Sequence, residues 1–515
     1  MDAALDFVDG TLNGVIWKVV PWALIGAGLY FGLRTLFVQI RMFPDMLKAV
    51  AETPKGKDAQ GRDLDEEYGG ISAFKAFTIS AASRVGTGNI AGVALAISIG
   101  GPGAVFWMWM LALLGGATSF IESTLAQLWK TKDDEGNYHG GPAYYMTRGL
   151  GWRRLAVLFS LFLAITYGFI YNAIQTNSIV AAVGTSLDND SFALKAIIAA
   201  VLAVLTALVI FGGVTRIASW TQVIVPFMAG AYILLGVWVL IVNASEIPTM
   251  FSMIVEHALG LKQLAGAGIG AAFMQGMRRG LFSNEAGMGS APNAAATATV
   301  SHPVKQGLVQ TLGVYFDTLI VCTITAFVVL LGPAVNYGAD DVQGVSLTQS
   351  ALADSLGAWA AHAITFILFF LAFSSVIGNY YLAQTNLEYL TDSKTAMTFF
   401  ASWSSASSSS ALSAPCPWCG RWVTRWQAFW PSSTSRPSSR WAGWPSSCCR
   451  TTTSSAARAW TRSSTVRCCR RSATWSSGTA PTRSPAAAWR TASRPANPGR
   501  PTLPWRARAW LSRVR

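Results

Sequence analysis

Long apolar segments, separated by shorter polar connections, make up most of the first 390 residues. An α-helix needs about 20 mostly apolar residues to cross a bilayer, so segments of this length predict membrane-spanning helices. Only 12% of the chain is charged, whereas soluble proteins average about 25%. The pattern therefore predicts a multi-pass, all-α membrane protein. Its nine expected crossings are residues 15–38, 76–99, 103–129, 155–183, 194–211, 221–242, 264–277, 307–331 and 359–390.

The second crossing is interrupted by polar residues and glycines near its middle. From Arg84 to Val93 it reads RVGTGNIAGV, which places Thr87 and Asn89 among three glycines at about mid-membrane depth. Glycine costs roughly 1 kcal/mol relative to alanine inside a helix. Loosened backbone at this depth needs protein or a water-filled cavity to satisfy its polar groups. We therefore predict a broken helix that lines a binding site, with tight helix packing through small residues as the alternative.

The seventh crossing is also interrupted. It is short and rich in glycine, and we predict that it breaks at residues 275–280 and continues as a polar connector over 281–305. Five crossings separate the starts of the two interrupted segments, which run in opposite directions through the membrane. Corresponding broken helices in two inverted halves are the best sequence indication of a transporter site at mid-membrane.

Basic and acidic residues alternate between successive loops. Because cytoplasmic loops carry an excess of Lys and Arg, the basic loops predict the cytoplasmic side. This assignment places the N-terminus outside the cell, with the protein in the cell membrane. The first residues lack the basic region that opens a signal peptide. The basic loops are 39–75, 130–154, 213–218 and 278–306, and the acidic loops lie near residues 188, 246 and 340.

The composition changes abruptly near residue 400. The last 115 residues hold 18 Arg, 12 Trp and six of the seven Cys, but no Asp, Glu or Lys. The formal charge of +14 arises there, since residues 1–400 carry 21 basic and 25 acidic side chains. A disordered tail would be poor in aromatic residues. We interpret 399–515 as an out-of-frame reading that starts near 398–402, with a disordered tail or a basic nucleic-acid-binding arm as the less favoured alternatives.

The carboxylates of Glu122 and Asp317 lie well inside predicted crossings, where ionisable residues mark functional sites by default. We expect Glu122 to support unwound backbone. For Asp317 three roles stay open, namely a cation site, proton transfer, and a salt bridge with Arg84, Arg278 or Arg279. The chain has no P-loop for ATP and no nucleophile–base or metal-ligand constellation in its body, so we expect neither an enzyme nor an ATP-driven pump.

Two long motifs resemble the sodium:alanine/glycine symporter family: GGPGAVFWMW over 100–109 and GMRRGLFSNEAGMGSAP over 276–292. VGTGNIA over 85–91 and QTNS over 175–178 fit the same resemblance, which covers about residues 10–398. It implies the inverted-repeat (5+5 helix) secondary transporter fold of the bacterial leucine transporter, with one extra N-terminal helix. The implied parts are 1–75 (extra helix and cytoplasmic loop), 76–243 (first repeat), 244–398 (second repeat, whose last two helices are lost to the altered tail) and 399–515 (tail).

The resemblance also implies a substrate site. The amides of Thr87 and Gly88 would hold the substrate carboxylate, and Asn89 would add a side-chain oxygen to a cation site beside it. Gln175 would face the same cavity, with a hydrogen bond between helices as an even alternative. The pocket and gate for the substrate side chain would include Phe273 and Gln275.

A sodium site is implied where the first break meets the last long helix. Carbonyls of Ala82 and Val85 and the hydroxyls of Ser374 and Ser375 would form it, with one more carbonyl from Leu371 or Ala372. A shell made only of oxygen suits a hard monovalent cation.

The resemblance thus implies Na+-coupled symport of small neutral amino acids, chiefly alanine or glycine, by alternating access. We expect a monomer in a lipid bilayer with no nucleic-acid partner. A proton-coupled amino-acid transporter and a non-functional truncated member of the family remain alternatives, and a passive channel is disfavoured by the two breaks.

Overall fold

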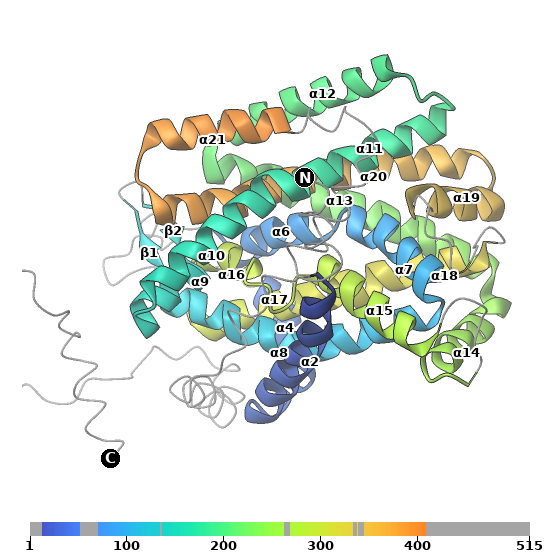
Figure 1. Ribbon diagram of the computed structural model, residues 1–515, viewed down its shortest axis with the longest axis horizontal. Coiled ribbons are helices and arrows are strands. Elements are labelled where there is room, and N and C mark those ends of the chain that lie inside the picture. The colour runs from blue at the N-terminus through green and yellow to red at the C-terminus, as the bar shows by residue number, and fades with distance from the viewer. Residues whose placement is uncertain are drawn as a thin grey trace, which may run out of the picture. The chain divides into compact units, whose positions relative to one another are not determined.

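The computed structural model describes residues 13–51, 71–133, 136–261, 268–332, 337 and 344–407, which are almost entirely helical (Figure 1). Within these residues, seven helical segments are long and apolar enough to cross a membrane, and they match seven of the nine predicted crossings. The other two predicted crossings, 76–99 and 264–277, are the interrupted ones. Predictions for the tail beyond residue 407 lie outside the described residues.

The first part of the chain contains a short β-hairpin, formed by β1 and β2, and the first interrupted helix. Its elements are α2 (Asn13–Arg34), α3 (Val38–Arg41), α4 (Phe43–Ala51), α6 (Ala73–Arg84), η2 (Gly88–Gly92), α7 (Val93–Gly100), α8 (Gly103–Leu128), β1 (Thr131–Lys132), β2 (Tyr138–His139), α9 (Pro142–Tyr145), η3 (Met146–Leu150), α10 (Arg153–Ile165), η4 (Thr166–Ile170), α11 (Tyr171–Leu187), α12 (Phe192–Ile210) and α13 (Gly213–Val242).

The second part contains the second interrupted helix and the longest helix. Its elements are η5 (Ala244–Glu246), α14 (Ile247–Ala258), α15 (Ile269–Asn284), α16 (Ala291–Thr297), α17 (Pro303–Tyr315), η6 (Phe316–Cys322), α18 (Thr323–Leu331), α19 (Gly344–Leu356), α20 (Trp359–Leu390) and α21 (Lys394–Ser407).

The first break is confirmed at the position that the sequence predicts. α6 begins after Ser72, whose hydroxyl accepts a hydrogen bond from the Lys75 amide at 3.2 Å, and ends at Arg84. Val85 is extended (φ −83°, ψ 96°), and the chain resumes as the π-helical turn η2 before α7. Such turns are rare and frequently occur at functional sites. From Val85 to Gly92 every residue except the partly exposed Ala91 is buried, so the loosened backbone faces protein.

The second break lies later in the chain than we predicted. α15 runs unbroken through residues 275–280, because the glycines there allow close packing on α8. A Cβ at Gly276 would lie only 2.4 Å from the Ala104 carbonyl oxygen. The backbone turns instead over 285–290, where Gly287 has a φ of 82°, a region that favours glycine. The predicted polar connector is therefore partly helical, since α16 follows this break.

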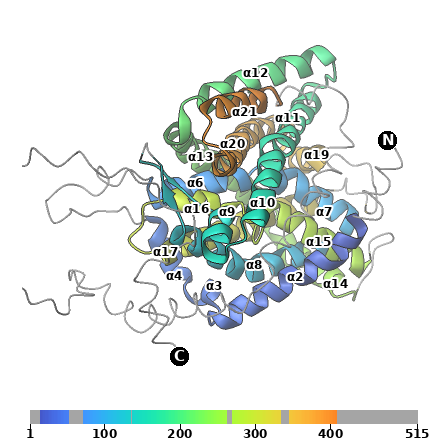
Figure 2. The ribbon, with the colours of Figure 1, turned by 60° about the vertical axis from the view of Figure 1, so that its left-hand side comes forward.

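The two interrupted helices pack among the long ones. α8 packs against α2, α15, α16 and α17, and α20 packs against α10, α11 and α13. α6 contacts α13, α16, α17 and α20, which joins the two groups. The extra helix α2 lies at the edge against α8 (Figure 2). The breaks are thus enclosed by helices on several sides, as a site in mid-membrane requires.

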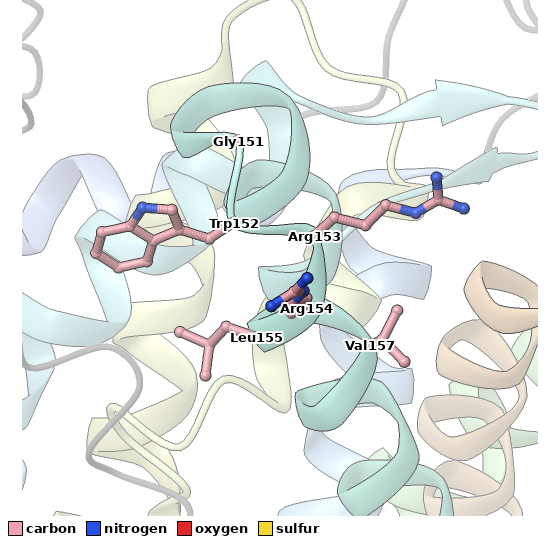
Figure 3. Close-up of a pocket in the computed structure, with 6 residues that line it drawn as sticks. All are labelled: Gly151, Trp152, Arg153, Arg154, Leu155 and Val157. Carbon is pink, nitrogen blue, oxygen red and sulfur yellow. The ribbon is translucent and has the colours of Figure 1, made fainter.

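Apolar side chains also cover the outside of several long helices, as expected for surfaces in contact with lipid. On α10, the half-exposed residues Val157, Leu158 and Leu161 alternate with the buried residues Ala156 and Phe159. The turn before α10 forms an open hollow on this outer surface (Figure 3).

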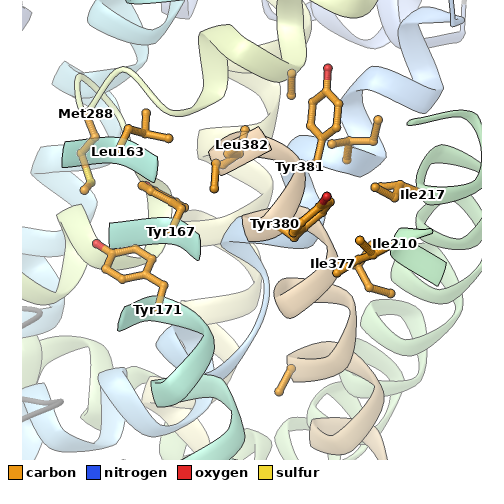
Figure 4. Close-up of a cluster of buried hydrophobic side chains, with 14 of the residues drawn as sticks. Leu163, Tyr167, Tyr171, Ile210, Ile217, Met288, Ile377, Tyr380, Tyr381 and Leu382 are labelled. Carbon is orange, nitrogen blue, oxygen red and sulfur yellow. The ribbon is translucent and has the colours of Figure 1, made fainter. Parts of the chain in front are cut away.

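The largest buried cluster joins α10, η4 and α11 to α20. Tyr167 and Tyr171 lie on one side of it, with ring centroids 4.6 Å apart, and Tyr380 and Tyr381 lie on the other (Figure 4). Burying a side chain of this size stabilises the fold by about 1.5–3 kcal/mol. This packing fixes α20 beside α11, and both helices contribute predicted site residues.

One further helix follows α20, although we expected none after residue 390. α21 has 14 residues, fewer than the roughly 20 needed for a crossing. Phe400 packs against Phe169 with ring centroids 5.4 Å apart, and the Ser404 hydroxyl donates to the Gly168 carbonyl at 2.9 Å. The predicted boundary at residue 399 therefore falls inside a helix that packs on η4.

The hairpin of β1 and β2 holds the end of α20. His139 lies between two carboxylates, with Nε2 2.7 Å from Asp133 Oδ2 and Nδ1 2.8 Å from Glu388 Oε2, and its side chain is 13% exposed. Burial lowers the pKa of His139, but the two carboxylates outweigh that effect and raise the pKa to about 9. At neutral pH the charged imidazole therefore links the hairpin to α20.

We expect the thermal stability of the protein to fall as the pH rises from 6.5 to about 9, the unfolded and folded pKa values of His139. A raised pKa stabilises the fold fully below the unfolded value, and that stabilisation is lost as the pH passes the folded value. The difference corresponds to roughly 3 kcal/mol. Thermal unfolding of His139→Gln should lose this slope, and His362→Gln, at an exposed site, should keep it. Equal slopes for His139→Gln and the parent would contradict the assignment.

Candidate functional site

Asn89 in η2 lies in a buried polar cluster with α15 and η6. Its Nδ2 donates to Asp317 Oδ1 at 2.6 Å and to Ser283 Oγ at 3.0 Å. Ser283 Oγ donates to Asp317 Oδ2 at 2.7 Å, and Thr318 Oγ1 donates to the same oxygen at 3.0 Å. All four side chains are fully buried. The first break thus contacts an intramembrane carboxylate that is hydrogen-bonded by neutral donors.

The salt bridge considered for Asp317 is not formed. Among the described residues, no ion pair joins Asp317 to an arginine. The buried Arg84 donates through Nη1 to the Gln310 carbonyl at 3.2 Å. The Arg278 guanidinium lies over the Trp17 ring of α2, 5.1 Å from its centroid. Cation binding and proton transfer therefore remain for Asp317.

The predicted sodium residues are brought together where α6 ends beside α20. Ser375 Oγ lies 3.0 Å from the Leu371 carbonyl oxygen and 3.4 Å from the Val85 carbonyl oxygen, and these two acceptors share its single hydrogen. Ser374 Oγ donates to the same Leu371 carbonyl at 2.7 Å. Ala82 is buried on the last turn of α6. Hydroxyl and carbonyl oxygens from both helices therefore meet at the first break.

The predicted carboxylate-binding amides lie beside Gln175 of α11. The Thr87 amide donates to Gln175 Oε1 at 3.3 Å, and the Gly86 amide donates to Asn89 Oδ1 at 2.9 Å. The Thr87 hydroxyl is buried and has no hydrogen-bond partner among the described residues. Thr87, Gln175 and Asn89 are therefore gathered around one stretch of unwound backbone, next to Gly88.

Phe273 and Gln275 lie elsewhere. Phe273 packs edge-on against Trp107, with ring centroids 4.9 Å apart, and stacks on Trp22 of α2 at 5.3 Å. Gln275 packs against Gly100 at the end of α7, where a Cβ on that glycine would lie 2.9 Å from Gln275 Cβ. The structure thus places both residues at the far end of α7 from the unwound backbone.

Phe282 and Ser283 lie beside the first break, in the place where we expected Phe273 and Gln275. A Cβ at Gly88 would lie 3.1 Å from the Phe282 ring and 3.6 Å from Ser283 Cα. The difference follows from the later break in the second interrupted helix. Because α15 continues, the eight residues from Gln275 to Ser283 rise about 12 Å along the axis.

Glu122 supports unwound backbone, as we expected, and does so at the second break. Its two carboxylate oxygens accept hydrogen bonds from the amides of Gly287 and Gly289, each at 3.2 Å. The turn that carries these amides is fully buried, and losing the acceptor of a buried backbone group costs about 1–3 kcal/mol. Glu122 therefore fixes the shape of the second break.

Glu122→Gln should destabilise the protein by about 1–3 kcal/mol, the cost of losing one of these two buried hydrogen bonds. A neutral amide supplies one acceptor and opposes the second backbone N–H with its own donor. Thermal unfolding measures the change, and Glu246→Gln, at an exposed position of η5, is the matched control. Equal stability of the two variants would show that Glu122 does not hold the break.

Glu285 is a site residue that the sequence reasoning missed. It opens the second break with a positive φ of 54°, uncommon for a residue with a side chain. Its Oε2 accepts from Ser290 Oγ at 2.6 Å and from Ser83 Oγ of α6 at 3.3 Å. Glu285 thereby links the first interrupted helix to the second. The sequence signal was Gly287 and Gly289, which follow this acid at the second and fourth positions.

Two interrupted helices that meet in a buried, oxygen-rich cluster, inside a set of membrane-spanning helices, define a membrane transporter. The chain belongs to the sodium:alanine symporter family, whose family model matches residues 1–410. The transporter resemblance found in the motifs is thereby confirmed.

Individual relatives agree with this family. The chain is 51% identical over 385 residues to the amino-acid carrier protein AlsT of Bacillus subtilis (strain 168), covering 75% of this chain and 78% of that one. It is 40% identical over 400 residues to the sodium/alanine symporter AgcS of Methanococcus maripaludis, covering 76% and 85%. Its fold is similar to that of MhsT, solved in complex with L-phenylalanine, with a TM-score of 0.53 at 16% identity over 71% of this chain and 87% of that chain.

Proposed function

We propose that the protein imports small neutral amino acids, alanine or glycine, together with Na+, across the cell membrane. The observation that carries the proposal is the meeting of the Ser375 hydroxyl with the Val85 and Leu371 carbonyls at the first break. Neutral oxygen ligands suit Na+. A Na+ ion bound by oxygens of both α6 and α20 would hold these two helices together, so the binding of the ion would be coupled to their movement apart. The name of the archaeal relative, sodium/alanine symporter, supports the same pairing of ion and substrate.

The substrate in this proposal lies against the unwound backbone of the first break. The Thr87 amide, which donates to Gln175 Oε1, would exchange that partner for the amino-acid carboxylate, with the Gly88 amide beside it. A bound carboxylate and the oxygens of Ser283 and Asp317 would then hold a second cation, and the Asn89 side chain would turn its Oδ1 from the Gly86 amide to join them. Small residues and the nearby Phe282 ring would limit the substrate to a small side chain.

Transport would proceed by alternating access about the two breaks. Glu285 and Ser83 link the breaks, so the two interrupted helices would move together within a 5+5 inverted repeat whose N-terminus lies outside. Phe273 and Gln275, toward the outer end of α7, would act at the outer gate. The functional unit in this proposal is a monomer.

Proton coupling is the second candidate, because Asp317 lies at the first break and, among the residues that the structure describes, only neutral groups donate hydrogen bonds to its carboxylate. In that case the proton bound by Asp317 would be the coupling ion in place of Na+. If the tail is out of frame, a third outcome is a chain that binds but does not transport.

Uptake of labelled alanine and glycine into proteoliposomes, with Na+ replaced by K+ or choline, tests the proposal. The chain and a form with its reading frame restored near residue 398 are compared. We expect uptake to require Na+. Ser375→Ala should raise the Na+ concentration for half-maximal uptake by about fivefold, the worth of roughly 1 kcal/mol of lost hydroxyl interaction. Ser355→Ala, which removes a hydroxyl bonded within α19, is the control. Uptake that persists unchanged in choline would exclude sodium coupling.

A further inference from the structure

The turn before α10 and the first turn of that helix form an open hollow of about 810 Å3 on the surface that faces away from the helix bundle (Figure 3). We propose that this hollow binds the head group and upper acyl region of an acidic phospholipid. The hollow has no part in the proposed transport site, because none of the residues of that site lies on α10 or on the turn before it. The residues that line it are Gly151, Trp152, Arg153, Arg154, Leu155 and Val157.

The charge of the hollow is unbalanced. Arg153 and Arg154 are both exposed, and within the described chain neither guanidinium forms an ion pair. Figure 3 shows the Arg154 side chain between the Trp152 ring and Val157, while Arg153 extends away from the same turn. Two adjacent cations without acidic partners attract a phosphate diester, and guanidinium geometry matches phosphate oxygens in pairs.

The position of the hollow favours a lipid over a soluble anion. α10 begins the spanning segment Arg153–Leu187, and its outer face continues with the half-exposed residues Val157, Leu158 and Leu161. Trp152 is 40% exposed at the start of this face, where aromatic rings typically sit at the level of lipid head groups. The two arginines therefore lie where head groups and the first acyl carbons meet.

The apolar part of the lining argues in the same direction. Trp152, Leu155 and Val157 line the hollow together with the two arginines, and a free phosphate ion would leave this apolar surface in water. The glycerol and upper acyl chain of a phospholipid would cover it. Basic pockets at the cytoplasmic side of membrane helices bind acidic head groups in this way, and the charge of loop 130–154 predicts that side here.

Binding is measured with the full-length protein in nanodiscs of phosphatidylcholine with increasing phosphatidylglycerol, by counting retained lipids in native mass spectrometry. Each arginine that lines the hollow should contribute roughly fivefold in affinity, so Arg153→Gln with Arg154→Gln should weaken phosphatidylglycerol binding about 25-fold. Phosphatidylcholine retention should not change. Arg153→Lys with Arg154→Lys should keep most of the binding, and Arg216→Gln, which removes an exposed arginine from the first turn of α13, should keep all of it.

Two further measurements decide the nature of the ligand. Soluble glycerol phosphate should not displace the lipid, and Trp152→Ala should weaken binding while Trp152→Phe retains it. Displacement by glycerol phosphate, or unchanged retention in the glutamine double variant, overturns the proposal. Alanine uptake is recorded in the same nanodisc lipids reconstituted as vesicles, so a failure of transport is separated from a failure of lipid binding.

Discussion

Asp317→Asn should reduce Na+-driven alanine uptake by about 100-fold or more, because it removes the only negative charge in the Asn89 cluster. Three neutral donors point at this carboxylate, and hydrogen bonds to a charged group are worth about 1.5–3 kcal/mol each. An amide would present its own donor hydrogens to at least one of these donors. The cluster would then lose both a cation ligand and the geometry that ties η2 to η6.

The matched control for this variant is Asp354→Asn, at an exposed position of α19, which should transport normally. Counterflow separates the two coupling ions. If Asp317 binds Na+, the Asn variant should lose Na+-dependent exchange of labelled for unlabelled alanine. If it carries a proton, exchange should persist and only the pH dependence of uptake should disappear. Full Na+-dependent uptake by Asp317→Asn would remove Asp317 from both roles.

The sequence predicted the seven continuous crossings and the first break well, because both depend on local composition. A run of about 20 apolar residues leaves few alternatives to a spanning helix. At the first break, Thr87 and Asn89 stand among the glycines, and polar side chains at mid-depth need partners. The prediction therefore rested on two independent signals that agreed.

The second break was misplaced because glycine has two uses in membrane helices. Gly276 and Gly280 allow α15 to approach α8 closely, where a Cβ would meet backbone or side-chain atoms of α8 within 2.4 and 3.1 Å. Gly287 and Gly289 instead adopt positive φ angles. Composition alone does not separate packing from turning, since only the neighbouring helix decides which applies.

The tertiary contacts of the site were beyond the sequence for a different reason. Asn89 and Asp317 are 228 residues apart, and their meeting depends on the rotation of η6 about its own axis. The π-helical turn shifts that rotation relative to a regular helix, and hydropathy carries no trace of it. Ser283 and Phe282 were missed for the related reason that the helix carrying them was ended too early.

Gly86→Ala should abolish Na+-dependent uptake while leaving the fold nearly intact. A Cβ at Gly86 would lie 2.3 Å from Ser375 Oγ and 3.1 Å from Gln175 Oε1. Gly86 does not adopt a positive φ, so alanine fits the backbone. Rotation of the Ser375 hydroxyl relieves this clash, because changing a single side-chain torsion costs far less than moving a helix. That rotation withdraws it from the Val85 and Leu371 carbonyls, which is where we propose that Na+ binds.

Two glycine variants make this test specific. At Gly92, six residues further on, a Cβ meets nothing within 4 Å, and alanine there should gain up to about 1 kcal/mol of helix propensity and transport normally. At Gly276 the clashing atom is the Ala104 backbone oxygen, which has no rotamer to change, so Gly276→Ala should lower the thermal midpoint as well as uptake. Gly86→Ala should stand apart by losing uptake and Na+-induced thermal stabilisation together, with an unchanged midpoint in the absence of Na+. If Gly86→Ala kept its stabilisation by Na+, the oxygen cluster at Ser375 would not be the sodium site.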